Sequence, residues 1–193
     1  AEQVRPELGR VGSVIEVNPA YLKSLINAAY VPIIASVGKG EDGGSFNINA
    51  DAVACAVAGA IGAQKIIFLT DVDGFYEDFD DKDSLVSRMS LQETRDMLAE
   101  GRVSKGMIPK LQSCVLSLEA GVHRAHIING TMPHSLLIEL LTQVGCGTLI
   151  YNDDEHNTKD EYAPLGLLAR REPLTKKKNC QRTGEIGELR NDL

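Results

Sequence analysis

Short apolar segments alternate with helix-like segments along most of this chain, and this alternation constrains the fold more than any other feature. Residues 65–69 (KIIFL) and 124–128 (RAHII) are short runs rich in branched apolar side chains. Such runs are typical of strands that are buried on both faces of a parallel sheet. The sequence therefore predicts an α/β fold with a mainly parallel sheet and helices on both of its faces.

Capping and turn residues set the boundaries that we expect for the elements. Asn18 before Pro19 is typical of a helix start, and Ser90 with Glu93 has the spacing of a capping box. The expected strands span 11–17, 30–36, 65–69, 124–128 and 147–151. The expected helices begin near 19, 50, 90, 106 and 133, and the segments 37–45 and 70–84 are expected to be loops.

Composition excludes several classes of protein. The 193 residues carry a net charge of -7, and an acidic chain is not expected to bind nucleic acid, because phosphate backbones select basic surfaces. The sequence contains neither an apolar run of ~18 residues, as a membrane span requires, nor a recognisable leader peptide, so we expect a cytoplasmic protein. The four cysteines lack metal-type or redox-type spacing, and Cys55 and Cys114 are expected to be buried thiols in helices.

The character of the sequence changes after residue 151. Residues 152–193 are polar and contain one short apolar patch, at 165–169. We therefore divide the chain into one folded unit at 1–151 and a polar C-terminal extension at 152–193.

Three loops follow the carboxyl ends of expected strands, where ligands bind in open parallel sheets. They span 36–51, 70–78 and 129–134, and the first two hold much of the glycine and polar punctuation of the chain. These loops are the expected place for a binding site.

Two charged residues near expected helix starts have both a structural and a functional interpretation. Asn49 suits an N-cap, so Asp51 falls at the second helical position, where a carboxylate stabilises the helix dipole. It could equally organise cations around a phosphate. Lys110 follows Pro109 at the start of another helix, where the dipole disfavours a cation. A phosphate clamp and a solvated lysine both remain open for Lys110.

The TDVDG segment after the third expected strand is ambiguous. Asp71 and Asp73 have ligand groups that Mg²⁺ prefers, yet an Asp-Gly pair is also ordinary turn chemistry. Neither a Walker sequence nor a dinucleotide-binding glycine pattern is present. His126 and His134 show no metal-ligand spacing and are expected to be structural.

Several of these motifs occur together, in an order and spacing that closely resemble the acetylglutamate kinases of the amino acid kinase family. The resemblance covers about residues 8–150. It rests on the motifs LGRVGSV, GEDGGSFNINADAVA, FLTDVDGFYED, SKGMIPKLQSC, GVHRAHIINGTMPHSLLIELL and GCGTLI. The resemblance implies a three-layer αβα sandwich, of which this chain is the C-terminal, ATP-binding lobe.

The resemblance also implies residue roles for phosphorylating the side-chain carboxylate of N-acetyl-L-glutamate with ATP, a step of arginine biosynthesis. By it, Lys110 stabilises the phosphoryl group in transfer, Asp51 orients the catalytic lysines, and Asn47 contacts acetylglutamate. The nucleotide would be lined by Asp71, Val72, Asp73, Gly74, Phe75, Tyr76, Arg102, Val103 and Ser104. Mg²⁺ would bridge the ATP phosphates and take much of its coordination from phosphate and water, so no protein metal ligand is assigned.

Two functions follow from the resemblance. In the first, this chain supplies the ATP-binding lobe of a homo-oligomeric kinase, and the other lobe supplies a further lysine, a Gly-Gly loop and an arginine. In the second, the chain is a non-catalytic nucleotide-binding or assembly module derived from that lobe. Turnover with the other lobe supplied in trans would discriminate between them.

Overall fold

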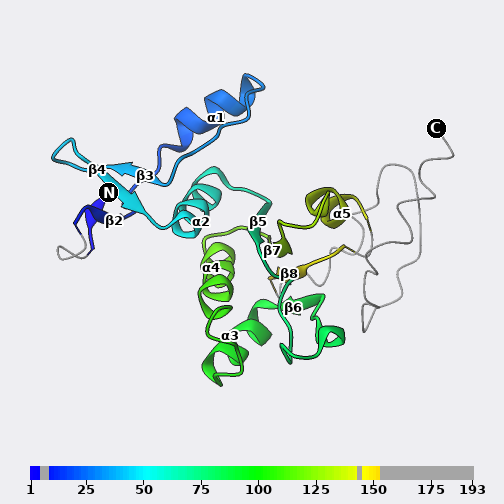
Figure 1. Cartoon of the computed structure of the whole chain (residues 1–193). Coiled ribbons are helices and arrows are strands. Elements are labelled where there is room, and N and C mark those ends of the chain that lie inside the picture. The colour runs from blue at the N-terminus through cyan, green and yellow to red at the C-terminus, as the bar shows by residue number, and fades with distance from the viewer. Residues whose placement is uncertain (5–8, 143–144, 153–193) are drawn as a thin grey trace, which may run out of the picture.

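The computed structural model describes residues 1–4, 9–142 and 145–152. Apart from residue 152, the predicted C-terminal extension lies outside the described residues. Two four-stranded sheets are present in this part of the chain (Figure 1). In spatial order, the first contains β1 (Glu2–Gln3), β2 (Val11–Ser13), β4 (Ser45–Ile48) and β3 (Val37–Lys39). The second contains β5 (Lys65–Thr70), β7 (Arg124–Asn129), β8 (Thr148–Tyr151) and β6 (Arg88–Ser90).

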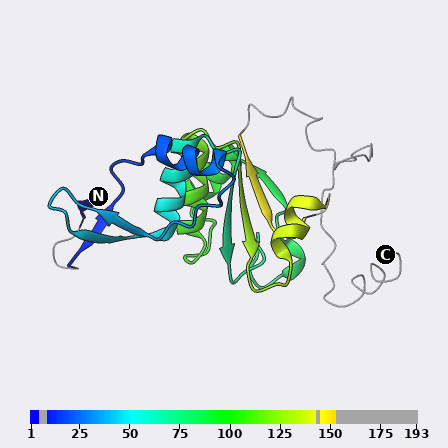
Figure 2. The ribbon, with the colours of Figure 1, turned by 90° about the horizontal axis from the view of Figure 1, so that it is seen from above.

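Helices cover both faces of the second sheet, as the sequence predicts. The helices are α1 (Pro19–Asn27), α2 (Ala50–Ile61), α3 (Leu91–Ala99), α4 (Ile108–Glu119) and α5 (Ser135–Leu141), with a short 3₁₀ helix, η2, at Lys82–Ser84. Figure 2 shows α2 and α4 on one side of this sheet and α5 on the other. The β5–β7 and β6–β8 pairs are parallel, and β7–β8 is antiparallel. The α/β layers are therefore confirmed, with a mixed rather than uniform strand direction.

The hydrophobic core lies between this sheet and helices α2, α3 and α4. The side chains of Leu111, Ile127 and Ile150 are completely buried within one apolar cluster. Cys55 and Cys114 are also buried there, as predicted, and burial raises the pKa of both thiols. The run at 124–128 is covered on both faces, as predicted, whereas the run at 65–69 buries only Ile66 and Phe68 on one face and leaves Leu69 58% exposed.

Local capping chemistry is confirmed at three helix starts. The Asn18 side chain accepts a hydrogen bond from Tyr21 N at 3.0 Å, and Asn49 accepts one from Ala52 N at 3.0 Å. In the Ser90–Glu93 capping box, the Ser90 side chain accepts a hydrogen bond from Glu93 N, and the Glu93 side chain accepts one from Ser90 N. These bonds satisfy backbone donors that a helix start leaves unpaired, which is why the sequence alone located them.

The predicted strand at 30–36 is wrong, because these residues belong to none of the strands of the described chain. Its ends are held by a bond from Tyr30 N to Leu25 O at 3.0 Å and one from Ile48 N to Ser36 O at 3.0 Å. Strand composition is not sufficient for a strand, since the ladder requires a neighbouring backbone.

The predicted loop at 37–45 is also wrong, because it forms the β3–β4 hairpin. Gly43 takes a φ of +78° at its tip, and Gly40 N donates to Gly44 O at 2.7 Å. Its glycines therefore close a hairpin turn. The strand β6 was not predicted, and it lies between the acidic loop and α3.

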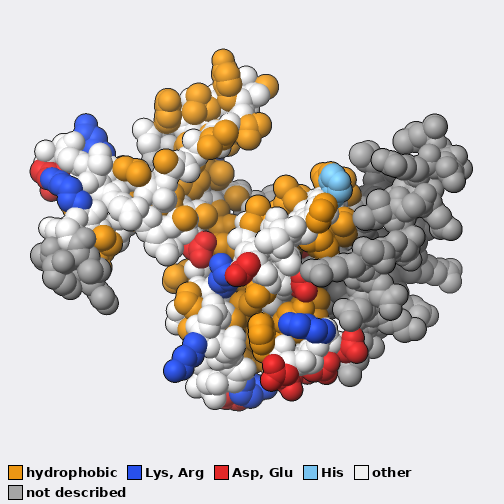
Figure 3. Space-filling model, in the orientation of Figure 1, with side chains coloured by type: hydrophobic (Ala, Val, Ile, Leu, Met, Phe, Trp, Pro, Cys, Tyr) orange, Lys and Arg blue, Asp and Glu red, His pale blue; other side chains and the backbone are white. Residues whose placement is uncertain are grey.

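The region around α1 exposes many apolar side chains. Helix α1 buries none of its residues, and the exposed fractions of Val31 and Ile33 are 88% and 97%. Figure 3 shows apolar side chains gathered over α1. A groove of about 540 Å³ adjoins it, lined by Pro32, Ile34, Ala35, Ser36, Ala50, Val53, Ala54 and Val57. Such a surface is typical of an interaction site.

The described helices are not suited to cross a membrane. Across 1–4, 9–142 and 145–152, none of them has the length and apolar character that this requires.

Candidate functional site

Helices α2 and α4 pack side by side with their starts at the same end. Cys55 in the middle of α2 donates to Ser113 O in the middle of α4 at 3.4 Å, and Ser117 donates to Cys55 Sγ at 3.1 Å. At the other end, a Cβ at Gly59 would lie 2.9 Å from the Cβ of Ala120, so glycine permits this close approach. The two N-termini are therefore neighbours, which places two positive dipole ends together.

Asp51 and Lys110 meet at these neighbouring helix starts. Lys110 Nζ lies 4.0 Å from Asp51 Oδ2, and the exposed fractions of the two side chains are 24% and 36%. This separation is longer than a hydrogen bond, so the pair leaves the ammonium group able to bind an anion. The structure thus brings together the two residues to which the resemblance gives catalytic roles.

The turn at 71–76 lies at the same edge of the second sheet. Short connections, 62–64 and 120–123, lead from α2 into β5 and from α4 into β7. Each helix therefore runs antiparallel to the strand that follows it, and its start lies near that strand's carboxyl end. Because β5 and β7 are parallel, with Thr70 paired with Asn129, the turn after β5 also lies at this edge.

Asp73 holds the turn together with both of its carboxylate oxygens. Oδ1 accepts a hydrogen bond from Asn129 Nδ2 at 2.8 Å, and Oδ2 accepts one from the Tyr76 hydroxyl at 2.9 Å. Asp71 is exposed, and its carboxylate accepts from the Thr70 hydroxyl at 3.1 Å. For Asp73, the geometry favours the turn interpretation over the Mg²⁺ interpretation.

Burial and the Asp73 carboxylate raise the pKa of Tyr76 to about 12, with desolvation the larger cause. We expect one of the five tyrosines to ionise near pH 12, detected by the ultraviolet absorbance of phenolate. Because the phenol keeps its proton longer in the folded state, its contribution to stability is present below pH 10 and is lost as pH rises toward 12. Tyr76→Phe should remove this late step, whereas Tyr21→Phe, at an exposed position, should not.

Residues 102–104 connect α3 to α4, close in sequence to Lys110. Val103 is buried in the core, Arg102 is exposed and forms an ion pair with Glu100, and Ser104 is exposed. The Ser104 carbonyl accepts from Met107 N at 2.9 Å, which opens the turn into α4. The backbone at 102–104 therefore positions the helix that carries Lys110.

Asn47 lies on β4, between the buried Phe46 and Ile48, so its side chain points to the opposite, exposed face. It precedes the N-cap Asn49 by two residues, which places it just before the start of α2. In the described part of the chain, the acidic, histidine and cysteine side chains form no cluster of three that could hold a metal ion. A Mg²⁺ ion here would rely on phosphate and water oxygens.

Two polar residues of this region, Asn129 and Thr148, were not singled out from the sequence. Asn129 begins the third strand-end loop, so its position was a usable signal. Thr148 gave none, because its partner Phe75 is distant along the chain and only the tertiary structure brings the two together.

Comparisons with known proteins identify the family of the chain. The sequence profile described as the amino acid kinase family matches residues 1–129. An acetylglutamate kinase of Methanocaldococcus jannaschii is 44% identical over 152 residues, covering 79% of this chain and 51% of that protein. An acetylglutamate kinase of Symbiobacterium thermophilum is 51% identical over 144 residues, covering 75% of this chain and 49% of that protein. The chain thus spans about half the length of the curated relatives it matches.

Solved structures show the same fold. An N-acetylglutamate synthase of Neisseria gonorrhoeae, complexed with coenzyme A and L-arginine, superposes with a TM-score of 0.68 at 30% identity, covering 75% of this chain and 33% of that one. A carbamate kinase of Giardia lamblia bound to AMP-PNP gives a TM-score of 0.55 at 21% identity, covering 71% and 45%. The second likeness supports the fold alone. With the profile match over two thirds of its length and these relatives, the chain belongs to the amino acid kinase family.

Proposed function

We propose that this chain supplies the ATP-binding part of an acetylglutamate kinase, which phosphorylates the side-chain carboxylate of N-acetyl-L-glutamate. The observation that carries the proposal is the meeting of Lys110 and Asp51 at two adjacent helix starts. The relatives that share 44% and 51% identity with the chain are named acetylglutamate kinases, which supports this substrate.

The proposed chemistry is charge neutralisation around a phosphoryl group in transfer. Lys110 donates to the oxygens of that group, and the backbone N–H groups at the starts of α2 and α4 add positive potential. Asp51 holds the ammonium group toward the site. Phosphoryl transfer depends on positioning and electrostatics more than on covalent chemistry, so such an arrangement is sufficient for a catalytic role.

We assign the adenine nucleotide to the turn 71–76 after β5 and to the segment 102–104, which leads into α4. In this assignment Asn47 contacts acetylglutamate, and Mg²⁺ neutralises the ATP phosphates when it is bound. The cytoplasmic location and the homo-oligomer expected from the sequence stay predictions.

The apolar surface around α1 is the proposed docking face for the half of the family fold that this chain does not match. Two observations support this occupant. The matched relatives are about twice as long as the matched region, and the 30–36 segment has strand composition but no strand partner among the described residues. Strands from the other half would pair with this segment and cover the apolar groove beside it.

The test is to co-express this chain with the half of the Symbiobacterium thermophilum acetylglutamate kinase that it does not match. We expect the two pieces to co-purify and to release ADP only when N-acetylglutamate is present. Ile33→Asp should reduce co-purification without lowering the thermal stability of the isolated chain, because Ile33 is 97% exposed. Leu116→Asp, at an exposed position on α4, is the matched control and should leave co-purification unchanged.

The alternative function is a non-catalytic nucleotide-binding or assembly module. It predicts that the co-purified pair binds ADP but shows no acetylglutamate-dependent turnover. The Asp51–Lys110 pair favours the kinase, because Asp51, besides stabilising its helix start, lies beside the lysine that would contact the transferred phosphoryl group.

A further inference from the structure

Thr148, at the start of β8, is a buried hydroxyl with two partners distant along the chain. Its Oγ1 accepts a hydrogen bond from Phe75 N at 2.8 Å and donates one to Val86 O at 2.6 Å. The residue is completely buried. One hydroxyl therefore connects β8 to two points of the loop between β5 and β6: Phe75 in the 71–76 turn, and Val86 just before β6.

The turn is packed directly on this hydroxyl. A Cβ at Gly74 would lie 2.5 Å from Thr148 Oγ1, so any larger residue at 74 would displace the turn. Phe75 is 2% exposed, and its carbonyl accepts from Val86 N at 2.8 Å. The backbone at 74–75 thus has one position relative to β8.

A second anchor holds the same turn from the neighbouring strand. Asn129, the last residue of β7, donates to Asp73 at 2.8 Å, and Tyr76 donates to the other oxygen of that carboxylate. The turn is therefore fixed by β7 through Asp73 and by β8 through Phe75. Rigid anchoring of this kind reduces the entropy that a ligand must remove when it binds.

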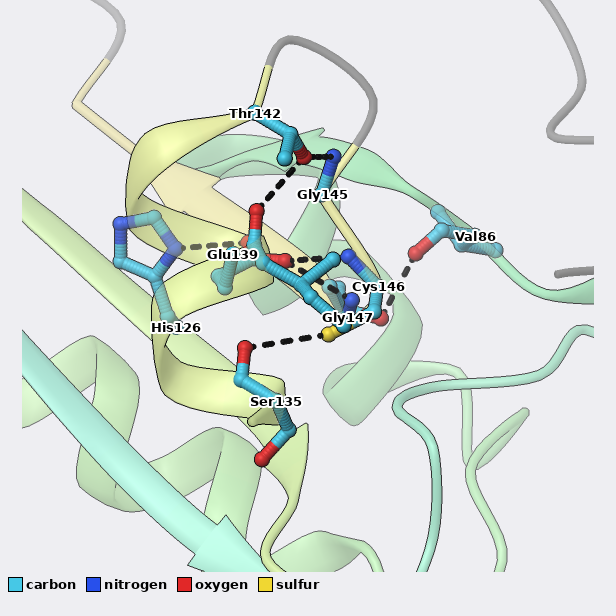
Figure 4. Close-up of polar contacts among 10 residues, drawn as sticks. Val86, His126, Ser135, Glu139, Thr142, Gly145, Cys146 and Gly147 are labelled. Carbon is cyan, nitrogen blue, oxygen red and sulfur yellow. Dashed lines mark hydrogen bonds and ion pairs between the residues drawn. The ribbon is translucent and has the colours of Figure 1, made fainter. Parts of the chain in front are cut away.

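Glu139 on α5 fixes the segment that leads into Thr148 (Figure 4). Its Oε2 accepts from Cys146 N at 2.6 Å and from Gly147 N at 2.9 Å, while Oε1 lies 2.9 Å from His126 Nδ1. The side chains of His126 and Glu139 are 7% and 5% exposed. A carboxylate buried this deeply is stable only when donors surround it, so these bonds hold 146–147 tightly against α5.

We propose that Thr148 is a positioning residue that holds the 71–76 turn in its nucleotide-binding conformation, and that Glu139 fixes the place of Thr148. This inference rests on the proposed nucleotide site. Thr148 itself is buried beneath the turn and acts through the Phe75 backbone.

The experiment measures the binding of ADP with Mg²⁺ to the chain by calorimetry, for the wild type and three variants. Thr148→Val keeps the shape but removes the hydroxyl, which leaves Phe75 N–H unpaired, and should weaken ADP binding about tenfold, equal to ~1.4 kcal/mol. Thr148→Ser keeps the hydroxyl and should bind within about twofold of the wild type. Thr94→Val removes another completely buried hydroxyl, which donates to the carbonyl of Ser90, the N-cap of α3, and is the control for stability.

We expect Thr148→Val and Thr94→Val to lower the melting temperature similarly, while only Thr148→Val weakens ADP binding and speeds hydrogen exchange of the Phe75 amide. Wild-type affinity in Thr148→Val would overturn the inference and leave the proposed function intact. Equal weakening in Thr94→Val would also overturn it, because the effect would then be one of general stability. A wild-type chain that fails to bind ADP at all would overturn the proposed nucleotide site itself.

Discussion

Lys110→Met is expected to lower kcat by about 10²–10³, with a smaller change in KM for ATP, when this chain is co-expressed with the unmatched half of the Symbiobacterium thermophilum kinase. Methionine keeps most of the length of the side chain and removes its charge. The Lys110 ammonium lies at the starts of α2 and α4, where charge would develop on the transferred group. An interaction that strengthens in the transition state affects kcat more than ground-state binding. The measurement is acetylglutamate-dependent ADP release under saturating ATP.

Arg95→Met is the matched control for Lys110→Met. Arg95 forms an ion pair with Glu119 at 2.6 Å between α3 and α4, and both side chains are more than 40% exposed. Removing this surface cation should change kcat by less than about twofold, since exposed ion pairs contribute ~0–1 kcal/mol. An unchanged kcat in Lys110→Met would contradict the assigned role and favour the assembly module.

Glu139→Gln is expected to give the largest loss of stability among single polar substitutions of the described residues, about 2–4 kcal/mol. The carboxylate accepts from Cys146 N and Gly147 N with one oxygen and faces His126 with the other. With its oxygen on the 146–147 N–H groups, an amide loses the strength that a charge gives those bonds, and its NH₂ group requires the His126 tautomer that accepts at Nδ1; in the opposite orientation, the NH₂ group faces two buried N–H donors. The measurement is the free energy of unfolding in urea. An m-value equal to that of the wild type would show that the substitution changes stability and not the surface exposed on unfolding.

Glu119→Gln makes the same chemical change at an exposed site and serves as the control. Its carboxylate is 44% exposed and paired only with Arg95 among the contacts of its side chain that are described. The expected loss is below about 1 kcal/mol. A similarly small loss in Glu139→Gln would show that the hydrogen bonds from Cys146 N and Gly147 N to Glu139 contribute little to stability. It would also weaken the inference that Glu139 fixes the place of Thr148.

The elements that sequence predicted correctly are those whose determinants lie within a few residues. Asn18 and Asn49 cap their helices through donors three residues away, and Ser90 with Glu93 forms its box over the same distance. The runs at 65–69 and 124–128 are also strands, since β-branched apolar composition favours a strand, although only 124–128 is buried on both faces. The strand predicted at 30–36 failed because its partner would have to come from elsewhere in the fold, and composition carries no information about that partner.

The candidate site shows the same division. Local pattern left Asp51 and Lys110 each with two interpretations, and only the resemblance joined them in one role. Their 4.0 Å separation arises because α2 and α4 pack in parallel through Cys55, Ser117 and Gly59. No local sequence pattern encodes that packing, so only the tertiary structure shows that Asp51 and Lys110 lie side by side.

By itself, the sequence determined the layer type, the helix starts, the strands at 65–69 and 124–128 and the family, because hydrophobic period, capping and motif spacing are properties of neighbouring residues. Only the tertiary structure decided that 37–45 is a hairpin, that Asp73 uses both oxygens to hold its turn, and that Thr148 supports Phe75. The physical reason is that hydrogen bonds and close packing between segments distant in sequence depend on their relative placement, which is fixed only when the whole core has formed.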